Sequence, residues 1–253
     1  MLKDYHIHTK RCNHAVGEMA RYVERAIALG LPEIAFTDHL PLPNDFDAVH
    51  RMAFHELDDY MRDIDRLRKE YPEISIRSGI EADYYEGFEE YLYRTLREFR
   101  FDITILSVHF IKGWPGDNMV FRYSFPGKPI RDVYSDYLSA LKKGVETGMF
   151  HLVGHLDVIK TEGFPLLETN PEEMEGLLGA IHEKAMAVEI NTSGMRKPIS
   201  HPYPSLDILP HLIRHGIPIT TGSDAHEPEQ VGFYFPELEN HLKQYDGLQF
   251  ASW

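Results

Sequence analysis

Two short histidine-bearing segments near opposite ends of the chain limit the possible folds more than any other feature. Residues 4–9 (DYHIHT) and 222–226 (GSDAH) each follow an apolar run typical of a β-strand. The alternation of His6 and His8 places both imidazoles on one face of a strand, because strand side chains repeat every two residues. In a closed barrel of parallel strands, the first and last strands are neighbours and their C-terminal ends open onto one mouth. The two segments therefore predict an α/β barrel that brings both ends of the chain to a single site.

The length and composition predict one domain. A chain of 253 residues, 43% of them hydrophobic, can bury the core of one α/β barrel, so we expect a single domain over residues 1–253. Its apolar runs are too short to span a bilayer, and it lacks the long apolar stretch of a secretory signal. The single cysteine, Cys12, fits a reducing compartment, and we interpret it as an incidental loop residue. These features predict a soluble cytoplasmic protein without a membrane partner.

The charge and the histidine content limit the partners. The net charge of −14 argues against a general nucleic-acid-binding protein, because phosphate backbones are held mainly by lysine and arginine. A phosphate-containing substrate should therefore be a small molecule. Fifteen histidines is a high number for this length, and histidine is the commonest metal ligand. The sequence does not predict an oligomeric state.

Seven short segments rich in Ile, Val, Leu or Phe predict buried strands. They end near His6 and His8, Asp38 and His39, Glu81, His109, His155, Asn191, and Asp224. Apolar residues at helical spacing over residues 57–71 and 133–145 predict helices that pack against the strands. The alternation of strands and helices supports a barrel of the α/β class.

Two irregular stretches, residues 40–54 and 110–129, directly follow ligand-bearing strands. Loops at this end of a barrel carry function, so we expect these stretches to form the walls of a substrate pocket. Their acidic and aromatic side chains are candidates for substrate recognition, namely Asp45, Asp47, Trp114 and Asp117. The alternative is that the parts farthest from the strands are ordinary surface loops.

Nine potential metal ligands lie at the predicted strand ends and in the first loop: His6, His8, His14, His39, Glu81, His109, His155, Asp224 and His226. This number is too large for one tetrahedral zinc ion and fits three metal ions best. His151 and His155 are four residues apart, about 13 Å along a strand, so they cannot share a metal, and we choose His155. We interpret the other histidines as hydrogen-bonded or surface residues: His50, His55, His151, His182, His201, His211, His215 and His241.

Six motifs together resemble a known family. They are His6-x-His8-Thr9, Thr37-Asp38-His39, Gly79-Ile80-Glu81, Ser107-Val108-His109, Gly154-His155 and Gly222-Ser223-Asp224-Ala225-His226. The set is similar to that of the polymerase and histidinol phosphatase (PHP) superfamily, in its histidinol-phosphate phosphatase branch. The resemblance spans nearly the whole chain and implies a distorted (β/α)7 barrel, similar to a TIM barrel, that holds a trinuclear metal centre.

The resemblance also implies how the ligands are shared. His6, His8, Glu81 and Asp224 would hold the first metal. Glu81 would bridge to a second metal, held also by His109 and His155. The third metal would be held by His14, His39 and His226. Histidine and carboxylate sites suit Zn, Fe or Mn, so the sequence leaves the identity of the divalent ions open.

The charge of such a centre predicts the reaction. Two carboxylates and seven neutral imidazoles leave about four positive charges when three divalent ions are bound, which favours a phosphate dianion. Closely spaced metals can activate a water for attack on phosphorus, so we expect Glu81 and Asp224 to act in phosphomonoester hydrolysis. The loop after the sixth strand carries Arg196, which is suited to bidentate phosphate binding and lies where the resemblance places a phosphate-binding basic residue.

Two other residues have less specific roles. Lys160, five positions after His155, is a second candidate for substrate binding, and the alternative is a solvated loop lysine. Asp38 can orient His39 or transfer protons, but adjacent strand residues point to opposite faces, so a structural role is at least as well supported.

These observations predict a hydrolase that cleaves L-histidinol phosphate to L-histidinol and inorganic phosphate in histidine biosynthesis. The reaction class rests on the ligands, and the substrate rests on the resemblance. One alternative is a phosphoesterase on the same scaffold that acts on phosphotyrosine, a nucleotide or an oligonucleotide end. Another is a noncatalytic metal-binding or polymerase-associated module. The complete set of ligands argues against the second alternative.

Overall fold

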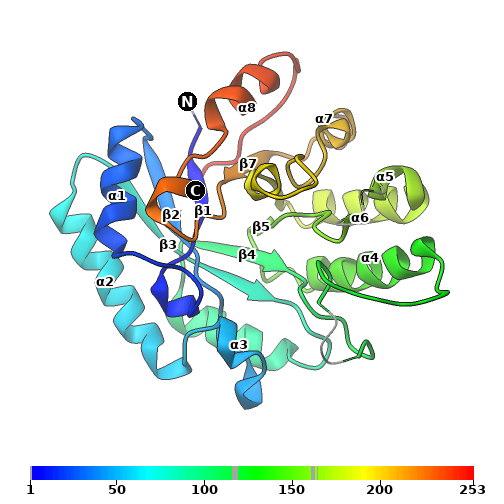
Figure 1. Ribbon diagram of the computed structural model, residues 1–253, viewed down its shortest axis with the longest axis horizontal. Coiled ribbons are helices and arrows are strands. Elements are labelled where there is room, and N and C mark those ends of the chain that lie inside the picture. Colours follow the sequence, from blue (N-terminus) through cyan, green and yellow to red (C-terminus); the bar gives the residue numbers. More distant parts are fainter. Residues whose placement is uncertain (1, 116–118, 161–162, 164) are drawn as a thin grey trace.

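The computed structural model describes residues 2–253 except 116–118, 161–162 and 164. Seven parallel strands follow one another in chain order, with helices on their outer side (Figure 1). The strands are β1 (Asp4–Ile7), β2 (Glu33–Phe36), β3 (Ser75–Asp83), β4 (Ile103–Ser107), β5 (Leu152–Val153), β6 (Ala187–Asn191) and β7 (Ile219–Gly222). The helices are α1 (Met19–Ala28), α2 (Leu57–Glu70), α3 (Glu89–Phe99), α4 (Ile130–Glu146), α5 (Leu166–Thr169), α6 (Pro171–Glu183), α7 (Leu209–His215) and α8 (Phe235–Leu242).

The two ends of the sheet meet, which nearly closes a barrel. An isolated parallel bridge joins Ile7 to Ala225, just beyond the end of β7, and the amide of His8 donates to the carbonyl of Ala225 over 2.9 Å. Buried Asp4 strengthens this junction, since its carboxylate accepts from the amides of Ser223 over 2.8 Å and Gly232 over 2.9 Å. The predicted (β/α)7 barrel is therefore confirmed. Its distortion is visible in the irregular register between β1 and β2 and in the two-residue strand β5.

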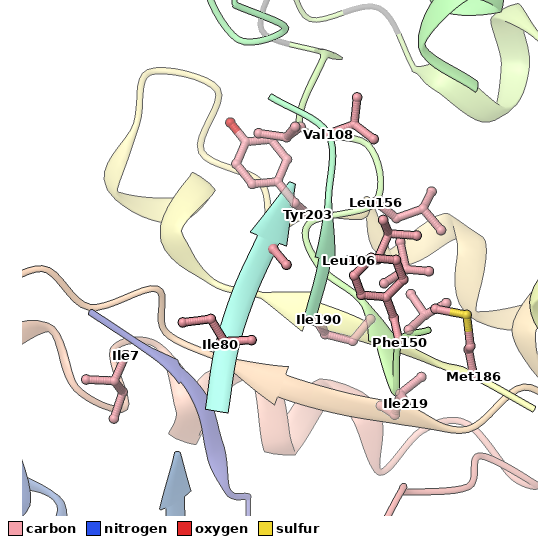
Figure 2. Packing of buried hydrophobic residues seen from close by; sticks show 14 of the residues in the cluster. Ile7, Ile80, Leu106, Val108, Phe150, Leu156, Met186, Ile190, Tyr203 and Ile219 are labelled. Atoms are coloured by element: carbon pink, nitrogen blue, oxygen red, sulfur yellow. The ribbon is translucent and has the colours of Figure 1, made fainter. Parts of the chain in front are cut away.

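The larger hydrophobic cluster lies between the strands and the surrounding helices. Figure 2 shows part of it, with Ile80 and Leu106 on neighbouring strands and Phe150 and Ile219 close by. Helix α4 packs closely here, because a Cβ atom at Gly144 would lie 2.7 Å from Leu106. Removal of apolar surface from water, at roughly 25 cal/mol per Å², supplies the main stabilisation of this layer.

A smaller cluster fills the barrel interior below the polar site. It contains Tyr5, Ala35, Ile103, Ile105, Leu152 and Ala187. Along β4, Ile103, Ile105 and Ser107 share one face because side chains alternate. The Ser107 hydroxyl donates to Glu81 over 2.6 Å, so the same face that is apolar at the N-terminal end becomes polar at the C-terminal end. The alternation of side chains along the strands thus places the predicted ligands at the C-terminal end of the barrel interior and the apolar residues at its N-terminal end.

The predicted boundaries differ from the observed ones at one functional strand. β3 continues two residues beyond Glu81 and ends at Asp83, so Glu81 projects from within the strand. The stretch 40–54 is irregular and contains two short 3-10 turns, Pro43–Asp45 and Ala48–His50. Among the described residues, no helix is both long and apolar enough to cross a membrane.

Candidate metal centre

The structure brings the nine predicted ligands together at the C-terminal end of the strands. Two compact groups of possible ligand atoms include a further residue, Cys12 with His8 and His226 and Asp83 with His39 and His109. The predicted ligands by themselves form three more groups, each with all ligand atoms within 4.8 Å of one another. These groups are His6 with His8 and Glu81, Glu81 with His109 and His155, and His14 with His39 and His226. Asp224 joins the first group, with its Oδ1 atom 3.2 Å from Nε2 of His8.

Glu81 lies at the centre of the cluster and is only 1% exposed. Its Oε2 atom is 2.8 Å from Nδ1 of His39 and 3.4 Å from Nε2 of both His6 and His8. Its Oε1 atom is 2.9 Å from Nε2 of His155. Burial opposes ionisation, but nearby histidine charges outweigh it and hold the pKa of Glu81 well below its usual value. A carboxylate with neighbours on both oxygens is suited to bridge two cations.

The contacts between the rings themselves point to a cation. Nδ1 of His14 faces the carbonyl of Cys12 at 2.6 Å, and Nδ1 of His226 faces the carbonyl of Asp224 at 3.0 Å. Because a carbonyl only accepts, both Nδ1 atoms carry the proton. Burial keeps both rings neutral by lowering the pKa of His14 and bringing that of His226 to about 4. Their Nε2 lone pairs then face each other at 2.9 Å, an arrangement that a shared cation stabilises.

Two buried atoms that face each other without a hydrogen bond support the same conclusion. Oε2 of Glu81 and Nδ1 of His39 lie 2.8 Å apart, yet neither has a hydrogen-bond partner of acceptable geometry among the described residues. An unsatisfied buried charge is costly unless an ion balances it. The donor set of imidazole nitrogens and carboxylate oxygens is one that divalent Zn, Fe and Mn accept, so the described residues fit divalent metal ions.

Glu189 is a functional residue that sequence reasoning missed. On β6, its Oε1 atom lies 2.7 Å from Nδ1 of His6, and its Oε2 atom accepts from the backbone amide of His155 over 2.8 Å. A carboxylate on Nδ1 turns Nε2 toward the centre and fixes the ring, as in many metal sites. Gly222 leaves room for it, since a Cβ atom there would lie 2.0 Å from Glu189. The available signal was an acidic residue in the otherwise apolar run before Asn191.

Asp83 was also missed, and it has the same relation to His109. Its Oδ1 atom accepts from the amide of His109 over 2.7 Å, and its Oδ2 atom lies 3.0 Å from Nδ1 of that ring. Nε2 of His109 consequently points toward Glu81, 3.7 Å away. Glu81 and Asp83 are two residues apart on β3, so the strand period alone places both on one face.

Two of the predicted ligands hold backbone conformations that non-glycine residues rarely adopt. Asp224 has φ of 53° and His155 has φ of 22°. Such geometry costs of order 1–3 kcal/mol and persists where surrounding contacts impose it, most often at functional sites. Here the amide of His155 is held by Glu189, and the carbonyl of Asp224 is held by Arg196.

A cavity of about 290 Å³ opens beside the ligand cluster. Its lining comprises three ligands, His14, His39 and His109, and residues of both predicted wall loops, Asp47, His50, Arg51, Met119, Phe121 and Arg122. Both loops therefore line a cavity beside the predicted ligands, and Asp47 is among its lining residues; that this cavity receives the substrate stays a prediction. Asp45 and Trp114 instead line separate cavities, and Asp117 lies outside the described residues.

Comparison with known proteins places this site in a family. The model of the PHP domain matches residues 4–193, and that of a PHP-associated region matches residues 212–248. The chain belongs to the PHP domain family. It is 34% identical over 247 residues to a protein of Deinococcus radiodurans named probable histidinol-phosphatase, covering 97% of this chain and 94% of that one. It is 32% identical over 260 residues to the histidinol-phosphatase of Bacillus subtilis, covering 92% and 96% respectively.

A solved PHP relative has the same fold. The crystal structure of histidinol phosphate phosphatase from Lactococcus lactis, in complex with zinc, L-histidinol and phosphate, superposes with a TM-score of 0.84. It is 25% identical and covers 100% of this chain and 96% of that one. The convergent histidines and carboxylates of this chain bind divalent metal ions.

Arg196 lies beside the cluster of predicted ligands, next to Asp224. It is in the 3-10 turn Ser193–Arg196, and its guanidinium donates to the carbonyls of Ser223 over 2.8 Å and Asp224 over 2.9 Å. Phe233 packs against it, with the guanidinium carbon 5.4 Å from the ring centre. Two donors fix the group beside a predicted ligand, and the remaining N–H groups are left for another acceptor.

The ammonium group of Lys160 forms its hydrogen bonds and its ion pair within the protein. The ammonium is buried and donates to the carbonyl of Pro202 over 2.7 Å and to the hydroxyl of Ser205 over 2.6 Å. It also pairs with Asp157 at 2.9 Å. Three partners account for its three donors, which favours a structural role in the loop after β5 over the substrate contact considered from the sequence.

Asp38 anchors the segment that follows β1, and Cys12 lies within that segment. Asp38 accepts from the amide of Thr9 over 2.8 Å and from the Thr9 hydroxyl, so it anchors the chain beyond His8 rather than orienting His39. Cys12 is buried with its sulfur within 4.8 Å of ligand atoms of His8 and His226. Burial raises the pKa of the Cys12 thiol to about 12, so the thiol is protonated at neutral pH.

Proposed function

We propose that this protein is a divalent-metal-dependent phosphomonoesterase that hydrolyses L-histidinol phosphate to L-histidinol and inorganic phosphate in histidine biosynthesis. The observation that carries this proposal is the convergence of nine predicted nitrogen and oxygen ligands in adjacent groups, two of which share the buried carboxylate of Glu81. The substrate is supported by the relatives named histidinol-phosphatase and by the Lactococcus enzyme, which was crystallised with zinc, L-histidinol and phosphate. A cytoplasmic location is part of the proposal.

The ligands would hold three ions in the three groups that the geometry defines. His6, His8, Glu81 and Asp224 would hold one ion, and His14, His39 and His226 another. Glu81 would share its second oxygen with His109 and His155 at the remaining ion. When bound, such ions lower the pKa of a coordinated water and neutralise charge on phosphoryl oxygens.

Arg196 and the walls of the cavity would position the substrate. The guanidinium of Arg196, fixed beside Asp224, would donate to phosphate oxygens and neutralise part of the dianion. The cavity beside the ligands would receive the organic part of the substrate. Asp47 supplies a carboxylate to its wall, where His50 and Arg51 also contact it, and Phe121 supplies an aromatic ring; such groups suit an ammonium and an imidazole.

We expect L-histidinol phosphate to be preferred over p-nitrophenyl phosphate, phosphotyrosine and nucleoside monophosphates by more than about tenfold in kcat/KM. All candidates share the phosphoryl group, so the walls of the cavity must discriminate between them. Phosphate release from this panel, measured side by side on one metal-loaded preparation, tests the substrate. Faster hydrolysis of phosphotyrosine or of a nucleotide would refute the substrate and leave the phosphomonoesterase activity standing.

We expect Arg196→Ala to lower kcat/KM by at least about tenfold, equivalent to about 1.4 kcal/mol, through loss of a charge-assisted contact with phosphate. Inorganic phosphate should also inhibit the variant less strongly. Lys197→Ala is the matched control, because Lys197 is the neighbouring cation and is exposed. An unchanged inhibition constant for phosphate in Arg196→Ala would place this side chain outside the substrate site.

A further inference from the structure

Arg51 is a buried cation in the wall of the cavity. It follows the turn Ala48–His50 and is only 3% exposed. Its Nε donates to Oδ2 of Asp47 over 3.1 Å, its Nη1 to the carbonyl of Leu40 over 3.1 Å, and its Nη2 to Oδ2 of Asp83 over 2.5 Å. A buried guanidinium is stable only when its donors are paired in this way.

The contact with Asp83 connects Arg51 to a predicted metal ligand. Asp83 accepts from Arg51 and, with the same carboxylate, holds both the backbone amide and Nδ1 of His109. Asp83 also lies within 4.8 Å of ligand atoms of His39 and His109, but both of its oxygens are already engaged by Arg51 and His109, which favours orientation of His109 over binding of an ion. An unbroken chain of contacts thus leads from the cavity wall at Asp47, through Arg51 and Asp83, to the ring of His109.

The positive charge of Arg51 balances the buried carboxylate of Asp83. Asp83 is 1% exposed and shares one face of β3 with Glu81, which is equally buried. Two buried carboxylates so close repel each other, and the guanidinium balances the outer one. The three acceptors of Arg51 lie in different directions, which the planar fork of an arginine can reach and the single ammonium of a lysine cannot.

We propose that Arg51 is a positioning residue for the metal centre, which fixes the ring of His109 through Asp83 and the cavity wall through Asp47. This inference rests on the proposed metal centre, but not on the identity of the substrate. Its consequence is that cation affinity at the group of Glu81, His109 and His155 depends on a side chain that is not itself a ligand. Loss of an outer partner of a metal-bound histidine costs about 10- to 100-fold in metal affinity.

Zinc binding to the stripped protein tests the proposal without any substrate. The variants are Arg51→Met, which removes the charge, and Arg51→Lys, which keeps it but loses the fork. Zinc affinity and stoichiometry are measured by competition with a chromophoric chelator, and stability by thermal unfolding of the stripped protein. We expect Arg51→Met to weaken one class of zinc sites by at least about tenfold and Arg51→Lys by a smaller factor of about three or more.

Arg68 provides a matched control. It also donates to two carboxylates, Asp65 and Asp102, and to one backbone carbonyl, that of Ile76, but it lies at the opposite end of β3. Arg68→Met should lower the melting temperature and leave zinc affinity unchanged. If Arg51→Met does not fold, Arg51→Lys decides the question. Wild-type zinc affinity at all sites in the folded Arg51 variants would overturn the proposal.

Kinetic measurements separate the effect of Arg51 on the cavity wall from its effect on the ring of His109. Asp47→Asn removes the charge at the wall end of the contact chain and leaves the contact between Arg51 and Asp83 in place, so it should raise KM for L-histidinol phosphate with zinc affinity retained. Arg51→Lys should lower kcat as well, in proportion to its loss of zinc. If Arg51 had a purely structural role, zinc affinity and kcat would be unchanged in Arg51→Met and Arg51→Lys at a temperature where these variants are folded. Failure of the substrate assignment would alter the kinetic results but not the zinc titration.

Discussion

Glu81→Gln is expected to reduce phosphate release by at least about a thousandfold, equivalent to about 4 kcal/mol of transition-state stabilisation, with the fold retained. The carboxylate belongs both to the group of His6 and His8 and to the group of His109 and His155, and among the described residues no other acid is shared by these two groups. Glutamine has nearly the same shape and can still accept from Ser107, so the barrel should persist. It lacks the negative charge that would balance two cations. Phosphate release, metal content and circular dichroism should be measured on the same preparation.

Glu33→Gln is a matched control for this experiment. Glu33 is likewise buried on a strand and accepts from Lys3, Tyr5, Ser75 and Arg77, but it lies at the N-terminal end of β2, away from the ligands. Its replacement should cost stability and leave turnover of the folded protein unchanged. Asp224→Asn should behave like Glu81→Gln. A Glu81→Gln variant with the wild-type rate and full metal content would contradict the assignment.

Removal of divalent ions by a chelator is expected to abolish turnover and to lower the melting temperature. Without ions, the lone pairs of His14 and His226 face each other, and the buried Oε2 of Glu81 accepts no hydrogen bond. An ion present at a hundredfold excess over its dissociation constant stabilises the folded state by about 2.7 kcal/mol per site. Return of Zn, Fe or Mn should restore both properties.

Elemental analysis of protein purified without chelator, combined with anomalous diffraction, measures how many ions are bound. We expect three per chain, because the ligands form three compact groups. A single ion at saturation, with the group of His14, His39 and His226 empty, would defeat the trinuclear proposal. An unchanged melting temperature after complete stripping would argue against any role of the ions in holding the site together.

Much of this site could be predicted because strand geometry is local. The alternation of His6 and His8 assigns both rings to one face, and parallel strands of a barrel bring their C-terminal ends to one mouth. The apolar runs ending near His39, His109 and His155 therefore sufficed to list ligands that the structure brings within a few ångströms of one another. The chain order of the strands and the closure between β1 and β7 follow from the same repeating pattern.

The partners of these ligands could not be predicted, because a residue's face on a strand does not identify what it contacts across the barrel. Glu189 is far from His6 in sequence, and only closure of the barrel places them 2.7 Å apart. The irregular loops have no period from which to infer direction. The sequence therefore could not show that Asp47 and Phe121, rather than Asp45 and Trp114, line the cavity.

The sequence by itself determined the chemistry and the end of the barrel at which it is concentrated, since ligand types and strand period are properties of short segments. Only the tertiary structure decided how the ligands are oriented. The rings of His6 and His109 are turned by carboxylates that packing, not spacing, brings to their Nδ1 atoms. The same holds for Arg51, which reads as an ordinary loop arginine until its loop folds over β3 and its guanidinium becomes the buried partner of Asp83. Long-range contacts of this kind depend on how layers of the fold pack together, and no local pattern encodes them.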